Sequence, residues 1–176
     1  MPNPRLLLIS GSLRARSSST AILRRCAELS AGLFDTDFYD GLDQLPAFSP
    51  DIEERGDADP LFPVEATRLR AMIGAADALL ISTPEYAHGL PGSLKNAVDW
   101  LVGSSTFPGI PFGIANTSPQ SVHAPAQLLE IVRTMSAVIV DDACMTVDPA
   151  QSEHTDGALR NALASLLAAA RTRHAS

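Results

Sequence analysis

The sequence lacks an excess of positive charge and any long hydrophobic run. Its 13 lysines and arginines face 20 aspartates and glutamates, which gives a net charge of −7. Such a chain is a poor partner for nucleic acid, because phosphate backbones require a basic surface. No apolar run approaches the roughly eighteen residues of a membrane span, and the apolar stretch after Arg5 is too short for a signal peptide. We therefore expect a cytoplasmic protein that binds neither nucleic acid nor membrane.

Cysteine and histidine are also scarce, and their spacing resembles no metal or redox motif. The two cysteines, Cys26 and Cys144, each lie in an apolar segment. Buried, reduced thiols are the expected state for such residues in the cytosol. His123, His154 and His174 are scattered along the chain, so the sequence predicts no metal site.

The sequence does contain a regular alternation of apolar runs with segments of helical period. Its length of 176 residues indicates a single domain over residues 1–176. Buried strands are predicted at about 5–10, 78–81, 111–115 and 137–140. A further strand at 33–39 has polar residues that suit a partly solvated edge position. Strands and helices that alternate in this way form a parallel sheet with helices on both faces. We predict an α/β, flavodoxin-like three-layer sandwich with strand order 2-1-3-4-5, in which the ligand lies between the carboxyl ends of strands 1 and 3.

One long irregular connection is predicted at residues 40–63, and it contains four prolines. A connection of this length in a small domain is usually functional or mobile. We interpret its acidic residues, between Asp51 and Asp59, as a solvated face. Helices are predicted at about 64–75 and, with a single apolar stripe, at 155–171.

The strongest functional signal is the loop that follows the first strand, at residues 10–20. Where a strand turns into a helix, unpaired backbone N–H groups and the helix dipole attract an anion. The loop adds hydroxyl and guanidinium groups from Ser12, Ser17, Ser18, Ser19, Thr20, Arg14 and Arg16. An ordinary serine N-cap is the alternative, but it accounts for a single hydroxyl. We interpret the loop as a phosphate cradle whose spacing matches neither the dinucleotide fingerprint nor the P-loop.

The loop after the third strand should then hold the rest of the ligand. Two prolines and two glycines within residues 83–92 give it an irregular backbone whose polar groups can face a planar molecule. Tyr86 offers an aromatic ring, and His88 a titratable donor. A rigid turn ahead of a buried helix is the alternative, and we adopt it for Leu94, Val98 and Trp100, which we expect in the core.

These two loops carry motifs that resemble a known family. The first motif is Gly11-Ser12-Leu13-Arg14-x-x-Ser17. The second is Thr83-Pro84-Glu85-Tyr86, followed by Pro91-Gly92-x-Leu94-Lys95-Asn96-Ala97-x-Asp99-Trp100. Together they are similar to the motifs of the NADPH-dependent FMN reductase family, which includes flavodoxin-like quinone, chromate and azo reductases. The resemblance covers roughly the first hundred residues.

The resemblance implies noncovalently bound FMN, with NADPH or NADH as co-substrate. The FMN phosphate would be held by Ser12, Arg14, Ser17, Ser18 and Ser19. The isoalloxazine ring would lie against Pro84, Glu85 and Tyr86, mostly through their backbone groups. Relatives often have a glycine-rich turn after the fourth strand, but residues 116–121 here contain no glycine. The hydroxyls of Thr117 and Ser118 would take the place of its N–H groups.

The implied function is an oxidoreductase that passes hydride through FMN to a quinone-like or other small acceptor in a ping-pong cycle. His88 is a candidate proton donor to the acceptor, because an imidazole titrates near neutral pH. The alternatives are a flavodoxin-type electron carrier, disfavoured by Arg14 and Arg16, a reductase that releases reduced FMN, and a binding module without flavin. Family members generally assemble, so a homodimer or homotetramer is expected.

Overall fold

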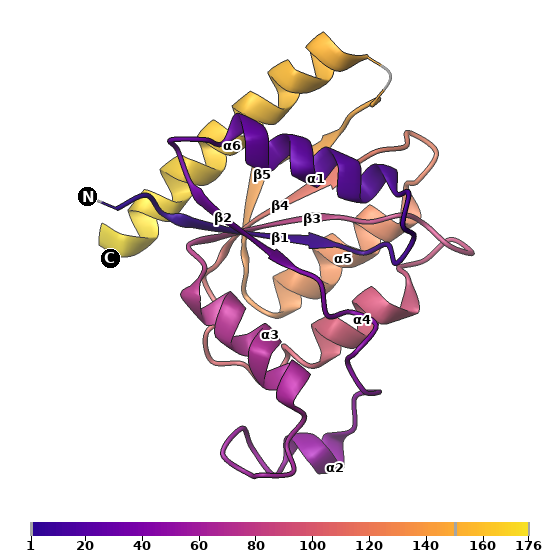
Figure 1. Ribbon diagram of the computed structural model, residues 1–176, viewed down its shortest axis with the longest axis vertical. Coiled ribbons are helices and arrows are strands. Elements are labelled where there is room, and N and C mark those ends of the chain that lie inside the picture. Colours follow the sequence, from indigo (N-terminus) through magenta and orange to yellow (C-terminus); the bar gives the residue numbers. More distant parts are fainter. Residues whose placement is uncertain (1, 150, 176) are drawn as a thin grey trace.

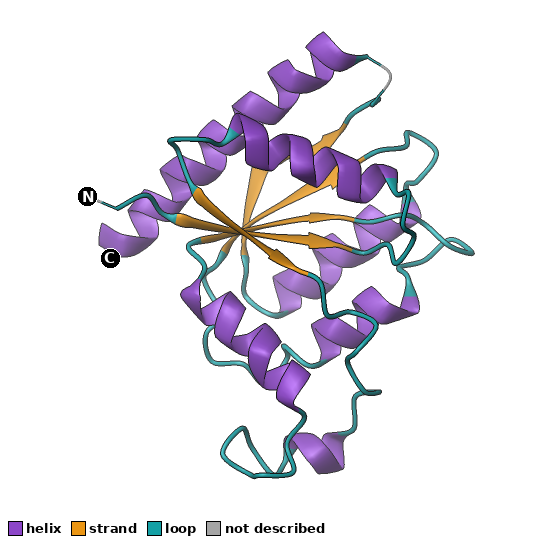
Figure 2. Cartoon of the chain, viewed as in Figure 1, coloured by secondary structure: helices purple, strands orange, loops and turns teal. Residues whose placement is uncertain are grey.

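The computed structural model describes residues 2–149 and 151–175 and shows a parallel sheet between two layers of helices (Figures 1 and 2). The sheet order is β2-β1-β3-β4-β5, which confirms the predicted order. The strands are β1 (Arg5–Ser10), β2 (Asp35–Tyr39), β3 (Ala78–Ser82), β4 (Pro111–Asn116) and β5 (Val138–Thr146). The helices are α1 (Ser18–Leu29), α2 (Pro50–Glu53), α3 (Val64–Ala75), α4 (Gly92–Asp99), α5 (His123–Thr134) and α6 (Ser152–Ala175).

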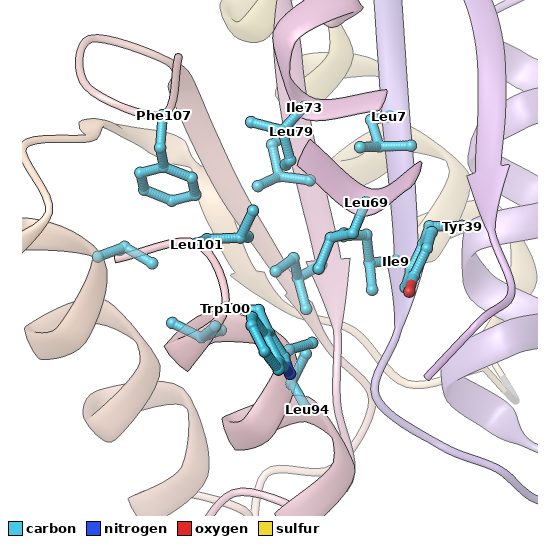
Figure 3. Close-up of a cluster of buried hydrophobic side chains, with 14 of the residues drawn as sticks. Leu7, Ile9, Tyr39, Leu69, Ile73, Leu79, Leu94, Trp100, Leu101 and Phe107 are labelled. Atoms are coloured by element: carbon cyan, nitrogen blue, oxygen red, sulfur yellow. The ribbon is translucent and has the colours of Figure 1, made fainter. Parts of the chain in front are cut away.

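Helices α1 and α6 cover one face of the sheet, and α3, α4 and α5 cover the other (Figure 1). Successive residues of a strand point to opposite faces, so each inner strand contributes to both cores. Leu6 and Leu8 of β1 pack under α1 and α6. Leu7 and Ile9 belong to the other core, which Figure 3 shows around Trp100. This two-sided burial is the reason that β1 reads as a continuous apolar run.

The largest difference from the predicted elements is β5, which continues to Thr146 where the apolar run suggested an end near residue 140. Asp141 and Asp142 interrupt the run, but they are exposed on this edge strand and are tolerated there. A register shift opposite Gly113 lets the strand continue. A Cβ at Gly113 would lie 2.8 Å from both the Cβ and the carbonyl oxygen of Ala143, so glycine permits this close approach.

The long connection at residues 40–63 contains helix α2 and is tied to helix α4. The carbonyl oxygen of Pro46 accepts hydrogen bonds from Asn96 Nδ2 and Trp100 Nε1, both at 2.9 Å. The backbone N–H of Phe48 donates to Asn96 Oδ1 at 2.8 Å. Two residues of the second motif, Asn96 and Trp100, therefore fix this connection in place.

The acidic segment of the connection surrounds a buried cation. The Arg70 side chain is 8% exposed, and its Nη2 lies 2.6 Å from Glu53 Oε2. Its Nη1 pairs with Asp57, and its Nε donates to the carbonyl oxygen of Trp100 at 2.8 Å. The predicted solvated face is therefore wrong for Glu53, whose side chain is 23% exposed and paired with Arg70. Asp57 also pairs with Arg70, but its side chain remains 49% exposed, as predicted.

The expectation of buried, reduced cysteines is confirmed for Cys26 and only in part for Cys144. Both are free, but Cys144 is half-buried, whereas burial raises the pKa of the Cys26 thiol to about 12. Among the described side chains, His154 is exposed and stands apart from the other histidines, while the side chain of His174 lies outside the described part of the chain. Within residues 2–149 and 151–175, no helix combines the length and the hydrophobicity needed to span a bilayer.

Replacing Asp156 by asparagine is expected to lower the melting temperature at neutral pH and to have no effect in strong acid. Arg25 on α1 holds the Asp156 carboxylate on α6 through two hydrogen bonds, of 2.9 and 2.5 Å. The arginine lowers the pKa of Asp156 below its usual 3.8 in the folded chain. The ionised carboxylate therefore stabilises the fold above that pH, and this contribution is lost as the pH falls through the folded pKa.

Thermal unfolding followed by circular dichroism at pH 7 and in strong acid, below the folded pKa of Asp156, measures this difference. Glu153→Gln is the matched control, since it removes an exposed carboxylate at the start of the same helix. An equal loss at both pH values would show that the carboxylate acts through packing and not through its charge.

Candidate functional site

The loops after β1 and β3 meet at the carboxyl edge of the sheet. The backbone N–H of Gly11 donates to the carbonyl oxygen of Ser82 at 2.8 Å. A Cβ at Gly11 would lie 2.5 Å from Thr83 Oγ1, so a side chain there would push the two loops apart. The glycine of the first motif therefore joins the phosphate cradle to the loop predicted to hold the ring.

Most of the predicted phosphate ligands lie on the open side of the cradle. Ser17 is the N-cap of α1, and its Oγ accepts from the backbone N–H of Thr20 at 3.3 Å. Ser12 Oγ accepts from the backbone N–H of Arg14 at 3.3 Å, and the Arg14 side chain is exposed. Ser18 is exposed as well, at the first position of the helix. These groups surround the N-terminus of α1, where backbone N–H groups and the helix dipole favour an anion.

Ser19 occupies a different position from the other cradle hydroxyls. Its side chain is 1% exposed and lies on the buried face of α1 with Ile22 and Leu23. Ser19 Oγ and Ser82 Oγ are both buried without a hydrogen-bond partner among the described residues. Buried hydroxyls without partners are uncommon, and these two lie at the start of α1 and at the end of β3. The phosphate role of Ser19 stays a prediction.

The loop after β3 forms a tight, strained turn. Tyr86 and Gly89 exchange two backbone hydrogen bonds, of 3.1 and 3.0 Å, around a two-residue turn. Ala87 and His88 in that turn have φ values of 50° and 58°, in the left-handed region. Each such residue costs about 1–2 kcal/mol relative to ordinary backbone, so the surrounding contacts must hold the turn in this form. Tyr86 is 49% exposed, and its ring is accessible from outside.

Helix α5 supplies the contacts that hold the turn. Glu85 Oε2 accepts from the backbone N–H groups of His123 and Ala124, at 2.7 and 2.9 Å. The backbone N–H of Leu90 donates to Gln127 Oε1 at 3.0 Å. These hydrogen bonds lower the pKa of the Glu85 carboxyl, and the bond from the N–H of Ala124 has the larger effect. Glu85 thus caps α5 from another loop, since Val122 at the N-cap position has no side-chain acceptor.

The turn after β4 achieves its shape without glycine. Asn116 Nδ2 donates to the carbonyl oxygens of Ser118 and Ser121, at 2.8 and 3.0 Å. None of residues 116–121, all of which the structure describes, has a positive φ. Thr117 Oγ1 lies 3.0 Å from Ser18 Oγ, so this turn is joined to the cradle. Ser118 Oγ donates to Gln120 Oε1 at 2.9 Å, which leaves the oxygen of Ser118 available as an acceptor.

A hollow of about 450 Å³ opens beside the cradle, toward the end of β2. Ser12 and Arg14 line it, together with Arg24 and Tyr39. Pro84, Glu85 and Tyr86 do not line it, so the surface predicted for the ring lies outside this hollow. Leu13 and Val122, each 58% exposed, add apolar surface from the neighbouring loops.

The comparison with known families identifies the chain. A sequence model described as NADPH-dependent FMN reductase matches residues 4–152. The chain belongs to this family. The match confirms the membership that the two motifs predicted, and it extends well beyond the first hundred residues. The family's cofactor fits the described residues, because the N-terminus of α1, with the hydroxyls of Ser12 and Ser17 and the exposed Arg14, is joined to an exposed aromatic turn through Gly11.

Curated members of the FMN reductase family include quinone reductases. The chain is 38% identical over 117 residues to a 2-hydroxy-1,4-benzoquinone reductase from a Burkholderia species, over 65% of this chain and 60% of that protein. It is 31% identical over 152 residues to a quinone reductase from Pseudomonas putida, over 81% and 74% of the two chains. The first match thus spans less than two thirds of that relative's length.

A solved structure shows the same fold. The NAD(P)H:(acceptor) oxidoreductase FerB, a flavoenzyme from Paracoccus denitrificans, superposes with a TM-score of 0.74 and 23% identity. The superposition covers 93% of this chain and 97% of FerB. This similarity supports the flavodoxin-like arrangement and is a statement about fold alone.

The contribution of α5 to the site is absent from the sequence-based prediction. His123 stands apart from the other histidines in the sequence, yet its ring stacks on that of His88 with 4.5 Å between centroids. The apolar residue Val122 at the start of α5 is a sequence signal for such a contact, because a helix without its own capping side chain needs an acceptor from elsewhere. Glu85 is that acceptor.

Proposed function

We propose that the chain is an FMN-dependent NAD(P)H oxidoreductase that passes electrons to a quinone-like or other small acceptor. The single observation that carries the proposal is the close contact of Gly11 with Ser82 and Thr83. It brings the N-terminus of α1, where an anion is favoured, and an exposed aromatic turn to one edge of the sheet. Family membership supports the same activity. When bound, FMN would supply the hydride and electron transfer.

The chain's own residues would bind and orient the cofactor. Arg14 and the N-terminus of α1 would neutralise the phosphate, with hydrogen bonds from the hydroxyls of Ser12, Ser17, Ser18 and Ser19. The backbone of Pro84, Glu85 and Tyr86 would face the ring, on a turn that α5 keeps rigid. Thr117 and Ser118 would contact the ring's pyrimidine end. Rigid donors of this kind stabilise developing negative charge without a cost of reorganisation.

The open surface beside Tyr86 supports a ping-pong cycle. Because this surface is not enclosed by the chain, a nicotinamide and an acceptor could occupy it in turn. His88 on the same turn is exposed and would donate a proton to the reduced acceptor. The family description names NADPH, so NADPH is the first co-substrate to test.

The purified chain is expected to bind FMN and to show its visible absorption. In the absence of oxygen, NADPH should bleach this absorption, and a benzoquinone added afterwards should restore it. The absorption near 450 nm, about where flavins absorb, follows each step. A yellow protein that NADPH does not reduce would leave the electron carrier as the better function. Reduced FMN found in the ultrafiltrate would favour the reductase that releases its flavin, and a chain that binds no FMN would overturn the proposal.

A homodimer or homotetramer is part of the proposal, with the second subunit bordering the flavin. Leu13, Tyr86 and Val122 expose apolar surface around the ring position, and a partner subunit would cover it. The docked connection at residues 40–63 and helix α4 form the adjacent surface. The expected cytoplasmic location stays a prediction.

A further inference from the structure

Three side chains with metal-binding groups converge beside the strained turn. The ligand atoms of Glu85, His88 and His123 all lie within 4.8 Å of one another. They come from the β3 loop and from the first turn of α5, and the proposed electron-transfer function assigns no role to this cluster as a unit. The two imidazole rings are stacked, 4.5 Å apart and inclined by 21°.

The backbones that carry these three side chains are fixed by independent contacts. Glu85 is held through Oε2 alone, by the N–H groups of His123 and Ala124, so its Oε1 remains available as a ligand. His88 lies in the turn closed by the paired Tyr86 and Gly89. The bond from Leu90 to Gln127 keeps that turn on α5. The backbone positions of the three ligands, and the Glu85 carboxylate, are therefore fixed without an ion, and only the two imidazole rings need to adjust.

The conformation of the turn is a second observation that points to this site. His88 adopts a φ of 58° next to Ala87 at 50°, where glycine would relieve the strain. This conformation places the imidazole of His88 against that of His123. Strain retained at a surface turn commonly marks a functional constraint, and here it brings two nitrogen ligands to one carboxylate.

We propose that Glu85, His88 and His123 form a site for a divalent transition-metal ion of the Zn²⁺ class. Two imidazole nitrogens and one carboxylate oxygen suit Zn²⁺, Co²⁺ or Ni²⁺, whereas Mg²⁺ and Ca²⁺ prefer oxygen ligands alone. Both histidines are exposed, so their rings can rotate to close the remaining distance around an ion of about 2 Å bond length. Three protein ligands leave a fourth position for water, on the same turn as Tyr86.

Isothermal titration of Zn²⁺ into the untagged, chelator-treated full chain tests the site, with and without FMN. We expect one ion per chain, and weakening by roughly tenfold or more in His88→Ala and in His123→Ala. His154→Ala removes an exposed histidine outside the cluster and is expected to leave the affinity unchanged. Mg²⁺ is expected to give no binding heat. Equal Zn²⁺ affinity in the wild type and the His88→Ala/His123→Ala double variant would overturn the proposal.

Imidazole proton resonances of the wild-type chain provide a measurement that needs no variant. Substoichiometric Zn²⁺ is expected to shift the ring signals of His88 and His123 and to leave those of His154 in place. Movement of the His154 signal instead would overturn the site. Because Zn²⁺ is tested on the flavin-free chain as well, failure to bind FMN and failure to bind metal are separate results.

Discussion

The Arg14→Ala variant is expected to bind FMN about ten- to hundredfold more weakly than the wild type. Arg14 is exposed on the open side of the cradle, its backbone N–H bonded to the Ser12 hydroxyl, and its guanidinium is a predicted ligand of the phosphate. A hydrogen bond between charged groups contributes about 1.5–3 kcal/mol, and about 1.4 kcal/mol corresponds to a tenfold change in affinity. Quenching of FMN fluorescence on titration with protein measures the effect.

Arg171→Ala is the matched control for this experiment. It removes an equal charge from an exposed site on α6, away from the cradle, and the dissociation constant for FMN should not change. Added salt should weaken FMN binding by Arg171→Ala, which keeps Arg14, more than FMN binding by Arg14→Ala, since screening weakens a contact between exposed charges. Wild-type affinity of the Arg14→Ala variant for FMN would show that Arg14 does not bind the phosphate, and it would contradict the prediction that the first motif forms the phosphate cradle.

The second large effect is expected from Trp100→Ala, which should lower the free energy of unfolding by about 3–5 kcal/mol. The Trp100 side chain is 0% exposed and contacts the rings of Phe48 and Phe62 edge to face, with centroids 5.2 and 5.6 Å away. It also donates to the carbonyl oxygen of Pro46. Its removal leaves a cavity between α4 and the long connection. Urea denaturation monitored by circular dichroism gives the loss.

Trp100→Phe separates the ring from its hydrogen bond. Phenylalanine keeps most of the packing but cannot donate to Pro46, whose carbonyl oxygen still accepts from Asn96. The loss should therefore be well below that of Trp100→Ala, about 1–2 kcal/mol. If both variants lose the same stability, the indole N–H and not the ring volume anchors the connection.

The parts of the fold that the sequence predicts well are those determined by local patterns. β1 and β3 are short apolar runs buried on both faces, and their period and flanking turns leave little choice of structure. Gly11 and the serines that follow it mark a strand-to-helix turn, which is a local feature as well. The strand order follows once the elements are known, because crossover connections have one hand.

The parts that the sequence did not predict depend on contacts between distant residues. Asp141 and Asp142 read as the end of a strand, and only the exposed edge position of β5 makes them acceptable in one. Glu53 reads as solvated until the position of Arg70 is known. His123 has no local sign of its role, since its neighbour His88 lies on another loop. Such pairs form through tertiary packing, and the periodicity of a single sequence carries no information about them.

The capping of α5 by Glu85 has a consequence for how the molecule opens. The first amide groups of the helix are protected by a side chain from the loop after β3, so hydrogen exchange at His123 and Ala124 requires that this loop detach. The loop and the start of the helix therefore behave as one cooperative unit of local unfolding. A substitution on the far side of α5 that loosens its first turn would alter the surface beside Tyr86 without touching it.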